Sequence, residues 1–358
     1  MLALVVALPS CSDFYMPTNG TALRLSVRTM DLGIDGGWNL SAVPKGLLRA
    51  QEDCPPARGK ALTWTSAHGY VGFSAPSYGF PVSHAIGEAL NERGLSCGAL
   101  ALTPSKMPEA SAELPNVHTK YFCQWAAEMF ATVDEVKAAL SGKVQLYGHA
   151  GEPGQPGLDY THWVLRDASG RSLVVEAAGI DSADGKIHLH DDFNDGGATG
   201  FGIMTNEPTF EYHLANVRHL EWKRTLVRQA VTVPGTYYPE ERFLRVHMVK
   251  SVMPVPKTLQ EGVAQAVATL NTVTVPMGEQ YGTDSGKRSA EMGTSDHTLW
   301  GVVRDHATPT VYYRSAGNPS LQRVRLADLD LSPGAPPRSL SVAAGPWFHD
   351  VAQEMRHR

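Results

Sequence analysis

The chain has 358 residues, 42% of them hydrophobic, and a formal net charge of −5. This length and apolar content are enough to bury a large core, as one big domain or as two. The near balance of charge and the shortness of the basic runs argue against nucleic acid as a partner. No apolar stretch reaches the roughly 18–20 residues that cross a bilayer, so no stable membrane span is predicted.

Residues 1–10 (MLALVVALPS) form a short apolar leader. Its size fits the hydrophobic region of a signal peptide, although no basic region precedes it. We expect this segment to be removed on maturation, as the end of an export signal or as a short pro-segment. Residues 11–358 then form a single domain. Export to the periplasm or out of the cell is expected, and a cytoplasmic location is the alternative.

Cys11 opens a predicted strand–turn–strand. Asn19-Gly20 is among the strongest short hairpin signals, and apolar and polar residues alternate along the returning strand. With Asn19 and Gly20 at the centre of the turn, Cys11 pairs with Arg28, and paired side chains lie about 4.5–5.5 Å apart. A guanidinium at that range lowers the pKa of a cysteine. The alternative is a buried apolar cysteine beside a surface arginine.

The rest of the chain alternates between strand-like and helix-like segments. Strands are predicted at 61–65, 70–74, 95–102, 162–167, 172–176, 299–303 and 311–313. Helices are predicted over 120–131, from a Thr132/Glu135 capping box to Leu140, from Pro208 through Val217, and over 259–270. The strands come in two blocks, each with helices nearby. This pattern favours an α+β fold of antiparallel sheets covered by helices over a doubly wound parallel sheet.

Metal and disulfide signatures are weak. Cys54, Cys97 and Cys123 lie far apart without CxxC spacing, which argues against a structural zinc site and a dense disulfide framework. If Cys11 is reactive, at least one of these three is free or bonded to another molecule. The run 188–192 (HLHDD) offers metal ligands, but without a third distant ligand it is interpreted as a solvated strand.

Five short motifs occur in a fixed order. They are Cys11, Arg28-Thr29-Met30-Asp31, Asn91-Glu92-Arg93-Gly94-Leu95, Met204-Thr205-Asn206-Glu207-Pro208-Thr209-Phe210 and Glu241-Arg242-Phe243-Leu244-Arg245. The set resembles the choloylglycine hydrolase family, which includes conjugated bile acid hydrolases and penicillin V acylases. The resemblance covers most of the chain from Cys11 onward. It implies an N-terminal nucleophile hydrolase fold, an αββα sandwich of two stacked antiparallel sheets between helical layers.

The resemblance also implies a site built on Cys11. Removal of the leader would free its α-amino group, whose ordinary pKa of about 7.7–8.0 suits a base near neutral pH. The thiolate would attack an amide carbonyl and form an acyl-thioester that water then hydrolyses. Asp31 would orient the amino group, and Arg28 and Arg242 would supply positive charge that favours the thiolate.

Two asparagines complete the implied catalytic set. Asn91 would stabilise the oxyanion, and Asn206 would position the amino group or the substrate amide. Each has a structural alternative, because Asn91 suits a turn and Asn206 suits a helix cap. The sequence departs from the family pattern at Glu88-Ala89, where Asp-Gly is common, and at Glu207, where serine is usual.

The expected partner is a small-molecule amide with an apolar acyl group. Conjugated bile acids, penicillin V and N-acyl homoserine lactones are the candidates, and the export-like leader favours a penicillin V type acylase. The resemblance implies no cofactor, no metal and a homotetramer. The rival reading is a non-catalytic lipoprotein lipidated at Cys11. Aromatic residues suggested for the acyl-binding wall are Trp64, Tyr70, Phe73, Tyr78 and Phe80.

Overall fold

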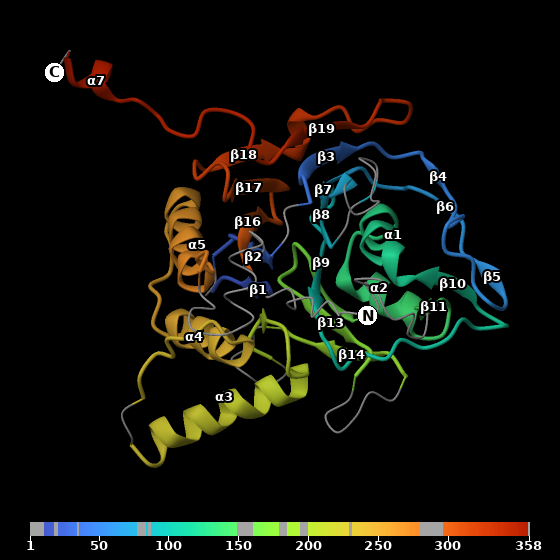
Figure 1. The fold of residues 1–358 in the computed structure, drawn as a ribbon, viewed down its shortest axis with the longest axis horizontal. Helices are drawn as coiled ribbons and strands as arrows, with labels where there is room; N and C mark the ends of the chain where they lie inside the picture. The colour runs from blue at the N-terminus through green and yellow to red at the C-terminus, as the bar shows by residue number, and fades with distance from the viewer. Residues whose placement is uncertain are drawn as a thin grey trace, which may run out of the picture.

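Two antiparallel sheets face each other and carry helices on their outer sides (Figure 1). The computed structural model describes residues 11–17, 21–33, 36–76, 84, 87–148, 160–178, 185–193, 200–228, 231–278 and 296–356. Within them the layers follow the αββα order, which confirms the fold expected from the sequence.

The first sheet has six strands in the order β15-β1-β2-β16-β17-β18. These are β15 (Ile203–Met204), β1 (Cys11–Tyr15), β2 (Leu25–Leu32), β16 (His297–Asp305), β17 (Thr310–Ser315) and β18 (Gln322–Arg325). Strand β1 therefore lies inside the sheet, and its first residue is Cys11.

The second sheet has eight strands in the order β14-β13-β12-β9-β8-β7-β3-β19. They are β14 (His188–Asp191), β13 (Ser172–Glu176), β12 (Thr161–Arg166), β9 (Ser96–Ala101), β8 (Glu88–Asn91), β7 (Tyr70–Ser74), β3 (Asn39–Val43) and β19 (Arg338–Ser341). Two small sheets lie beside it, one of β11 (Gln145–Tyr147), β10 (Pro115–His118) and β5 (Lys60–Ala61), the other of β4 (Leu48–Arg49) and β6 (Trp64–Thr65).

Helices cover the two outer faces. Helices α4 (Pro239–Ser251) and α5 (Leu259–Val273) pack on β1 and β2, and α3 (Phe210–Thr225) packs on α4. Helices α1 (Phe122–Met129) and α2 (Val133–Leu140) cover the second sheet, after a 3-10 turn at Thr119–Tyr121. A 3-10 turn at Leu326–Asp328 follows β18, and α7 (Ala352–Arg356) stands on an arm that leaves the body (Figure 1).

The apolar core is divided by the second sheet. One cluster fills the space between the two sheets and under α3, α4 and α5, and it includes Cys11, Phe73 and Trp300. The other lies between the second sheet and helices α1 and α2. Cys11 therefore belongs to the interior between the sheets, at the end of an internal strand.

Several local predictions are confirmed and others are wrong. The capping box of Thr132 and Glu135 begins α2, and the helix predicted over 259–270 is α5. The strand predicted over 61–65 is instead split between β5 and β6, which pair with different neighbours. Pro208 does not start α3: the helix begins at Phe210, with Thr209 as its N-cap residue.

The predicted hairpin is present, but the predicted pairing of its two strands is wrong. Cys11 pairs with Met30, and Arg28 pairs with Asp13. The ladder ends near Met16, whose N–H donates to the Leu25 carbonyl, so the connection is longer than a two-residue turn. Pro17, which follows, has no N–H with which to extend it. Asn19 and Gly20 lie outside the described residues.

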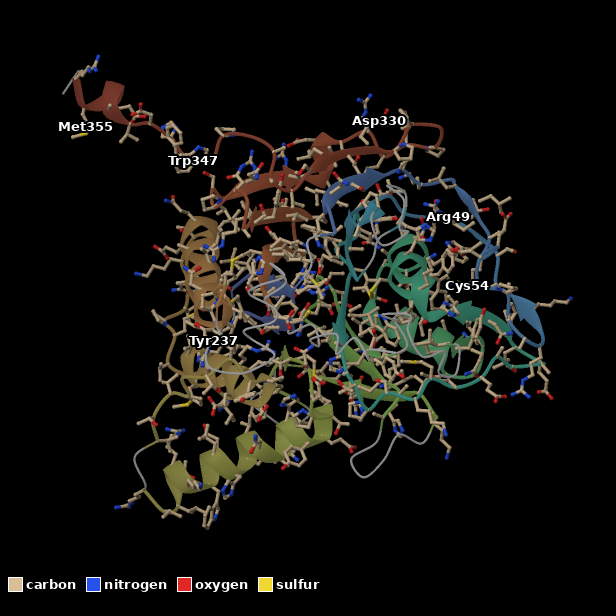
Figure 2. All side chains as sticks on the ribbon, viewed as in Figure 1. Arg49, Cys54, Tyr237, Asp330, Trp347 and Met355 are labelled. Atoms are coloured by element: carbon tan, nitrogen blue, oxygen red, sulfur yellow. A yellow bond between two sulfur atoms is a disulfide. The ribbon has the colours of Figure 1, made fainter. Side chains whose placement is uncertain are left out.

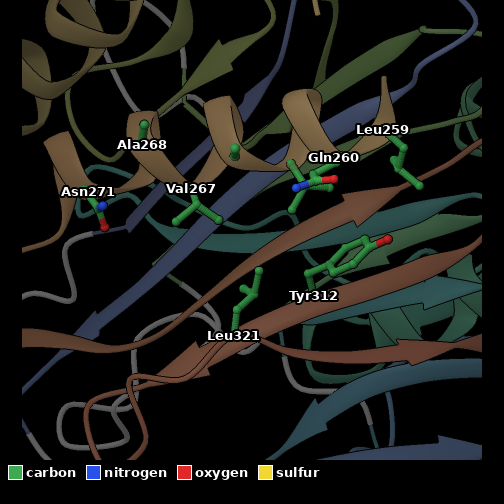
Figure 3. A pocket seen from close by; sticks show the side chains of 9 residues that line it. Leu259, Gln260, Val267, Ala268, Asn271, Tyr312 and Leu321 are labelled. Atoms are coloured by element: carbon green, nitrogen blue, oxygen red, sulfur yellow. The ribbon is translucent and has the colours of Figure 1, made fainter. Parts of the chain in front are cut away.

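An apolar groove of about 770 Å³ lies on the outer side of the first sheet, between α5 and β17 (Figure 3). Its lining includes Leu259, Val263, Val267, Tyr312 and Leu321. None of the predicted site residues lines it. Among the described residues, no helix has the length and apolarity needed to cross a membrane.

Candidate active site

Cys11 is buried at the start of β1, with 1% of its surface exposed. Its sulfur lies 3.9 Å from Arg28 Nη2 and 3.9 Å from Met30 Sδ, both on the neighbouring strand β2. The backbone N–H of Asp31 also donates to the sulfur. The two-residue difference in register leaves Arg28 on the same face as Cys11, since side chains alternate along a strand. The predicted approach of guanidinium and thiol is therefore present, although the two residues are diagonal rather than paired.

Burial dominates the ionisation of this thiol. Desolvation raises the pKa of Cys11 above its ordinary value, and the nearby charge of Arg28 offsets only part of that rise. The negative charge of Asp31 raises the pKa further. The expectation of a net lowered pKa is therefore wrong. Burial therefore favours the neutral thiol over the thiolate at Cys11.

The backbone nitrogen of Cys11 is bonded to Asn206, whose side-chain oxygen is in turn held by Arg242. Cys11 N donates to Asn206 Oδ1 at 2.5 Å, and the same oxygen accepts a hydrogen bond from Arg242 Nη2 at 2.8 Å. Arg242 Nη1 donates to the Cys11 carbonyl at 2.5 Å and to Ser12 Oγ at 2.7 Å. Asn206 Nδ2 donates to the Ala101 carbonyl on β9. Asn206 thus reaches both sheets and fixes the nitrogen that leader removal would turn into an amine.

Asp31 lies on β2 with its carboxylate held by two hydroxyl groups. Thr298 Oγ1 donates to Oδ1 at 2.5 Å, and Thr29 Oγ1 donates to Oδ2 at 3.2 Å. Burial raises the pKa of Asp31 to about 6, and the charge of Arg242 opposes that rise. The sequence reasoning missed Thr29 and Thr298, because a threonine in a strand carries no signal of its contacts.

Arg28 extends from β2 across to the second sheet. Its Nη1 donates to the Gly87 carbonyl and to Glu88 Oε2 at 3.3 Å, and its Nη2 donates to the Ala99 carbonyl. All of these groups are buried. Gly98 leaves room for them, because a Cβ at that position would lie 2.8 Å from Asp13 Oδ2 and 3.3 Å from Arg28 Nη1.

A chain of buried ion pairs continues from Glu88. Arg304 Nη1 lies 3.6 Å from Glu88 Oε1, and Arg304 Nη2 donates to Asp13 Oδ2 at 2.5 Å. Arg166 Nε donates to the other Asp13 oxygen at 2.7 Å. We call Asp13, Arg28, Glu88, Arg166 and Arg304 the inter-sheet charge cluster. Glu88 entered the sequence analysis only as a departure from the family pattern.

Asn91 is not brought to the sulfur. Its Nδ2 donates to the Ala127 and Phe130 carbonyls at the end of α1, and its Oδ1 accepts the N–H groups of Arg93 and Leu95. It points to the α1 side of β8, whereas Glu88, three residues earlier, faces Arg28. The structure therefore supports the turn interpretation of Asn91 and gives its side chain no contact with the site.

Of the three suggested acyl-wall aromatics that the structure describes, only Phe73 shares the core of Cys11. Phe73 stacks on Trp300 with ring centroids 4.0 Å apart, and the Arg28 guanidinium lies 5.5 Å from the Trp300 ring. Trp64 and Tyr70 belong to the clusters beneath α1. Tyr78 and Phe80 lie outside the described residues.

The other cysteines have structural surroundings. Cys97 on β9 forms a disulfide with Cys123 on α1, and Cys54, which is outside this disulfide, is buried far from the first sheet (Figure 2). In the described part of the chain, no group of three potential ligands is placed to hold a metal ion. In the 188–192 run, Asp191 accepts from Lys137, and Asp192 accepts from the Gly202 N–H.

Comparisons with known proteins identify the family to which the chain belongs. Residues 11–338 match the family described as linear amide C–N hydrolases, choloylglycine hydrolase family. The chain is 27% identical over 339 residues to a penicillin V acylase of Pectobacterium atrosepticum, covering 90% of this chain and 83% of the relative. It is 29% identical over 265 residues to a bile salt hydrolase/transferase of Bifidobacterium longum, covering 68% and 75%.

A solved structure gives the same result in three dimensions. Penicillin V acylase from Agrobacterium tumefaciens superimposes with a TM-score of 0.70 at 26% identity, over 92% of this chain and 91% of that one. The family match covers most of the chain and begins at Cys11. This chain belongs to the choloylglycine hydrolase family of enzymes that hydrolyse C–N bonds in linear amides.

Proposed function

We propose that this enzyme is an N-terminal cysteine amidohydrolase of the penicillin V acylase type, with Cys11 as its nucleophile after removal of residues 1–10. One observation carries the proposal. Asn206, Arg242 and Arg28 all converge on Cys11, with Asn206 bonded to its backbone nitrogen and Arg28 next to its sulfur. In the full-length chain that nitrogen is a peptide nitrogen and cannot act as a base. Cleavage before Cys11 would convert it into an amine.

The chemistry starts from the neutral thiol. The free α-amino group takes the thiol proton as the sulfur attacks the amide carbonyl carbon. The C–N bond breaks while the amino group returns the proton to the leaving amine, and the acyl group remains on sulfur as a thioester. Water then adds to the thioester, giving one proton to the amino group, and the C–S bond breaks to restore the thiol. Asn206 and the charge of Asp31 keep the amino group oriented throughout.

Burial of Cys11 argues against the lipoprotein alternative. A lipid-anchored cysteine must place its amino group and sulfur at the surface, where acyl chains can reach a bilayer. Here both atoms lie in the interior, hydrogen-bonded to Asn206 and next to Arg28. Acylation of the amino group would also remove the proposed base.

The substrate we propose is a linear amide with an apolar acyl group. Support comes from the apolar surroundings of the sulfur, which include Met30 and the Phe73–Trp300 stack. Ligand pockets of enzymes are mostly apolar with a few polar anchors. The sequence match to the Pectobacterium penicillin V acylase covers 90% of this chain, against 68% for the Bifidobacterium bile salt hydrolase, which favours penicillin V over bile acids. Solved structures of both kinds of enzyme cover 92% of the chain and support the shared fold equally.

Turnover measurements on Cys11→Ala test the proposal. Mature wild-type protein is assayed with penicillin V, glycocholate, taurocholate and a long-chain acyl homoserine lactone, and its N-terminal residue is identified by intact mass. We expect a free Cys11 at the N-terminus and hydrolysis of at least one amide. Loss of a nucleophile typically lowers kcat by roughly 10⁴-fold or more, so Cys11→Ala should retain essentially no activity.

Cys54→Ala is the matched control, because Cys54 is also a buried cysteine outside the Cys97–Cys123 disulfide but lies in another core. It should retain activity. Full turnover by folded Cys11→Ala, or a lipidated Cys11 in the mature protein, would refute the assignment. Faster hydrolysis of a bile acid or a lactone than of penicillin V would preserve the mechanism and change the substrate.

A further inference from the structure

We propose that Glu88 is a positioning residue that sets the reactivity of Cys11 by competing with its sulfur for the Arg28 guanidinium. This inference rests on the proposed role of Cys11 and adds a residue outside the implied catalytic set. Glu88 touches neither the sulfur nor the backbone nitrogen of Cys11 in any contact described above, so its effect passes through Arg28.

The geometry places one guanidinium between two groups that become negatively charged on losing a proton. Arg28 Nη1 faces Glu88 Oε2 at 3.3 Å, and Arg28 Nη2 faces Cys11 Sγ at 3.9 Å. The carbonyls of Gly87 and Ala99 hold the same two nitrogens in place on the second sheet. Because the guanidinium is fixed in this way, its charge is shared between carboxylate and sulfur without a movement of the side chain.

The remaining charges around this pair are also buried. Glu88 faces Arg28 from β2, Arg304 from β16 and, at longer range, Asp13 from β1. Cys11 faces Arg28 and Asp31 from β2, and Arg242 from α4 binds its carbonyl. Arg166 from β12 completes the inter-sheet charge cluster through Asp13. Arg28 is the member of this cluster that lies next to the sulfur, and its ion pair within the cluster is with Glu88.

The charge state of Glu88 changes in the range where the enzyme would work. Burial raises the pKa of Glu88 to about 7, while Arg304 and Arg28 oppose that rise. Below that pH the carboxyl is neutral, and the charge of Arg28 acts on the sulfur with little competition. Above it the carboxylate neutralises Arg28 and disfavours a second anion on Cys11. Glu88 therefore holds back formation of the thiolate as the pH rises.

Alkylation of Cys11 by iodoacetamide measures this effect directly. The thiolate displaces iodide from carbon, so the rate at each pH follows the ionised fraction of the thiol. The modified Cys11 peptide is quantified by mass spectrometry, separately from that of Cys54, and each variant is normalised to its rate at high pH. We expect Glu88→Gln to move the midpoint of the profile down by about one pH unit, with the thermal midpoint checked as a measure of folding.

Glu88→Asp gives a graded second variant. Its shorter carboxylate recedes from Arg28, so its midpoint should lie between those of wild type and Glu88→Gln. If Glu88→Gln does not fold, this variant alone decides, and its midpoint must lie below that of wild type. The matched control is Glu128→Gln, which removes a buried carboxylate paired with Arg49 on the outer side of the second sheet.

The outcomes are distinct. Midpoints that coincide with wild type in folded Glu88→Gln or Glu88→Asp would overturn the proposal, as would an equal shift in Glu128→Gln. Alkylation requires no substrate, so failure of this inference is separate from failure of Cys11→Ala to lose amide hydrolysis. A shift in the alkylation midpoint without a matching shift in the pH profile of kcat/KM would still show that Glu88 affects the pKa of the Cys11 thiol. It would also show that the pH dependence of hydrolysis follows the α-amino group instead of the thiol.

Discussion

The ionised carboxylate of Asp31 lowers the stability of the folded protein. Its carboxylate is fully buried, and two threonine hydroxyls and the charge of Arg242 compensate only partly for the loss of water. Because burial raises its pKa to about 6, the folded protein binds the Asp31 proton more tightly than the unfolded chain does. The resulting contribution to stability is complete below about pH 3.9, the ordinary carboxyl value, and is lost as the pH rises through 6.

Asp31→Asn removes that titration and makes the effect measurable. Asparagine has the same shape, and its side-chain oxygen can still accept a hydrogen bond from Thr298. The difference of about two pKa units corresponds to about 3 kcal/mol. We expect the free energy of unfolding of Asp31→Asn, relative to wild type, to increase by about that amount between pH 3.5 and pH 7. Urea unfolding at several pH values gives the number, and hydrolysis should fall because the amine loses its orienting charge.

The companion variant Thr298→Val should behave in the opposite way. It removes the hydroxyl that donates to the ionised carboxylate, so it should cost more stability at pH 7 than at pH 3.5. A difference between Asp31→Asn and wild type that is constant over this range would mean that Asp31 does not titrate with folding.

At the scale of single elements, the sequence predicted what depends on neighbours along the chain. The capping box at Thr132, the stripe of α5 and the strands β12 and β13 follow from local spacing, and the structure confirms them. The register of β1 on β2 could not be predicted, because it depends on where the ladder stops at Met16 and on a long connection. Asn91 shows a related difficulty: its residue type suits both an oxyanion donor and a turn, and the face of β8 on which it lies, which favours the turn, depends on the fold.

Asn91→Ala tests which of these roles is real. Its side chain makes four hydrogen bonds in a buried turn, and their loss leaves polar backbone groups without partners. We expect the free energy of unfolding to fall by about 3 kcal/mol. The kcat of the protein that remains folded should change little. An oxyanion donor would show the reverse pattern, with kcat lowered about 10²–10³-fold at unchanged stability.

At the scale of the whole molecule, the family resemblance carried by the ordered motifs implied the αββα architecture. In the structure, five of the six expected site residues lie together. What the sequence could not show is how the two sheets are joined through charge. Asp13, Glu88, Arg166 and Arg304 come from β1, β8, β12 and β16, and no spacing along the chain indicates that they meet. Their contacts depend on the stacking of the sheets and on the room left by Gly98. Arg28 and Cys11, by contrast, meet through the pairing of β1 with β2 within the first sheet.

The disulfide gives a further test at this scale, because it fastens the outer helix layer to the second sheet. Cys97 and Cys123 are 26 positions apart in the sequence, and the loop they close includes the whole segment between β9 and α1. Closing a loop of that length stabilises a protein by about 3–4 kcal/mol, mainly by restricting the unfolded chain. We expect the Cys97→Ala/Cys123→Ala double variant to lose about that much free energy of unfolding in urea. Wild type measured with a strong reductant should approach the same value.

The site should survive this change, since the disulfide lies on the α1 side of the second sheet and Cys11 lies between the sheets. The double variant is therefore expected to keep the alkylation profile of Cys11 and the kcat of wild type at temperatures where it is folded. A shifted profile would show that the position of β9, whose Ala99 and Ala101 carbonyls accept hydrogen bonds from Arg28 and Asn206, depends on the disulfide. The packing of the helix layer on the second sheet would then be coupled to the position of the charged groups between the sheets.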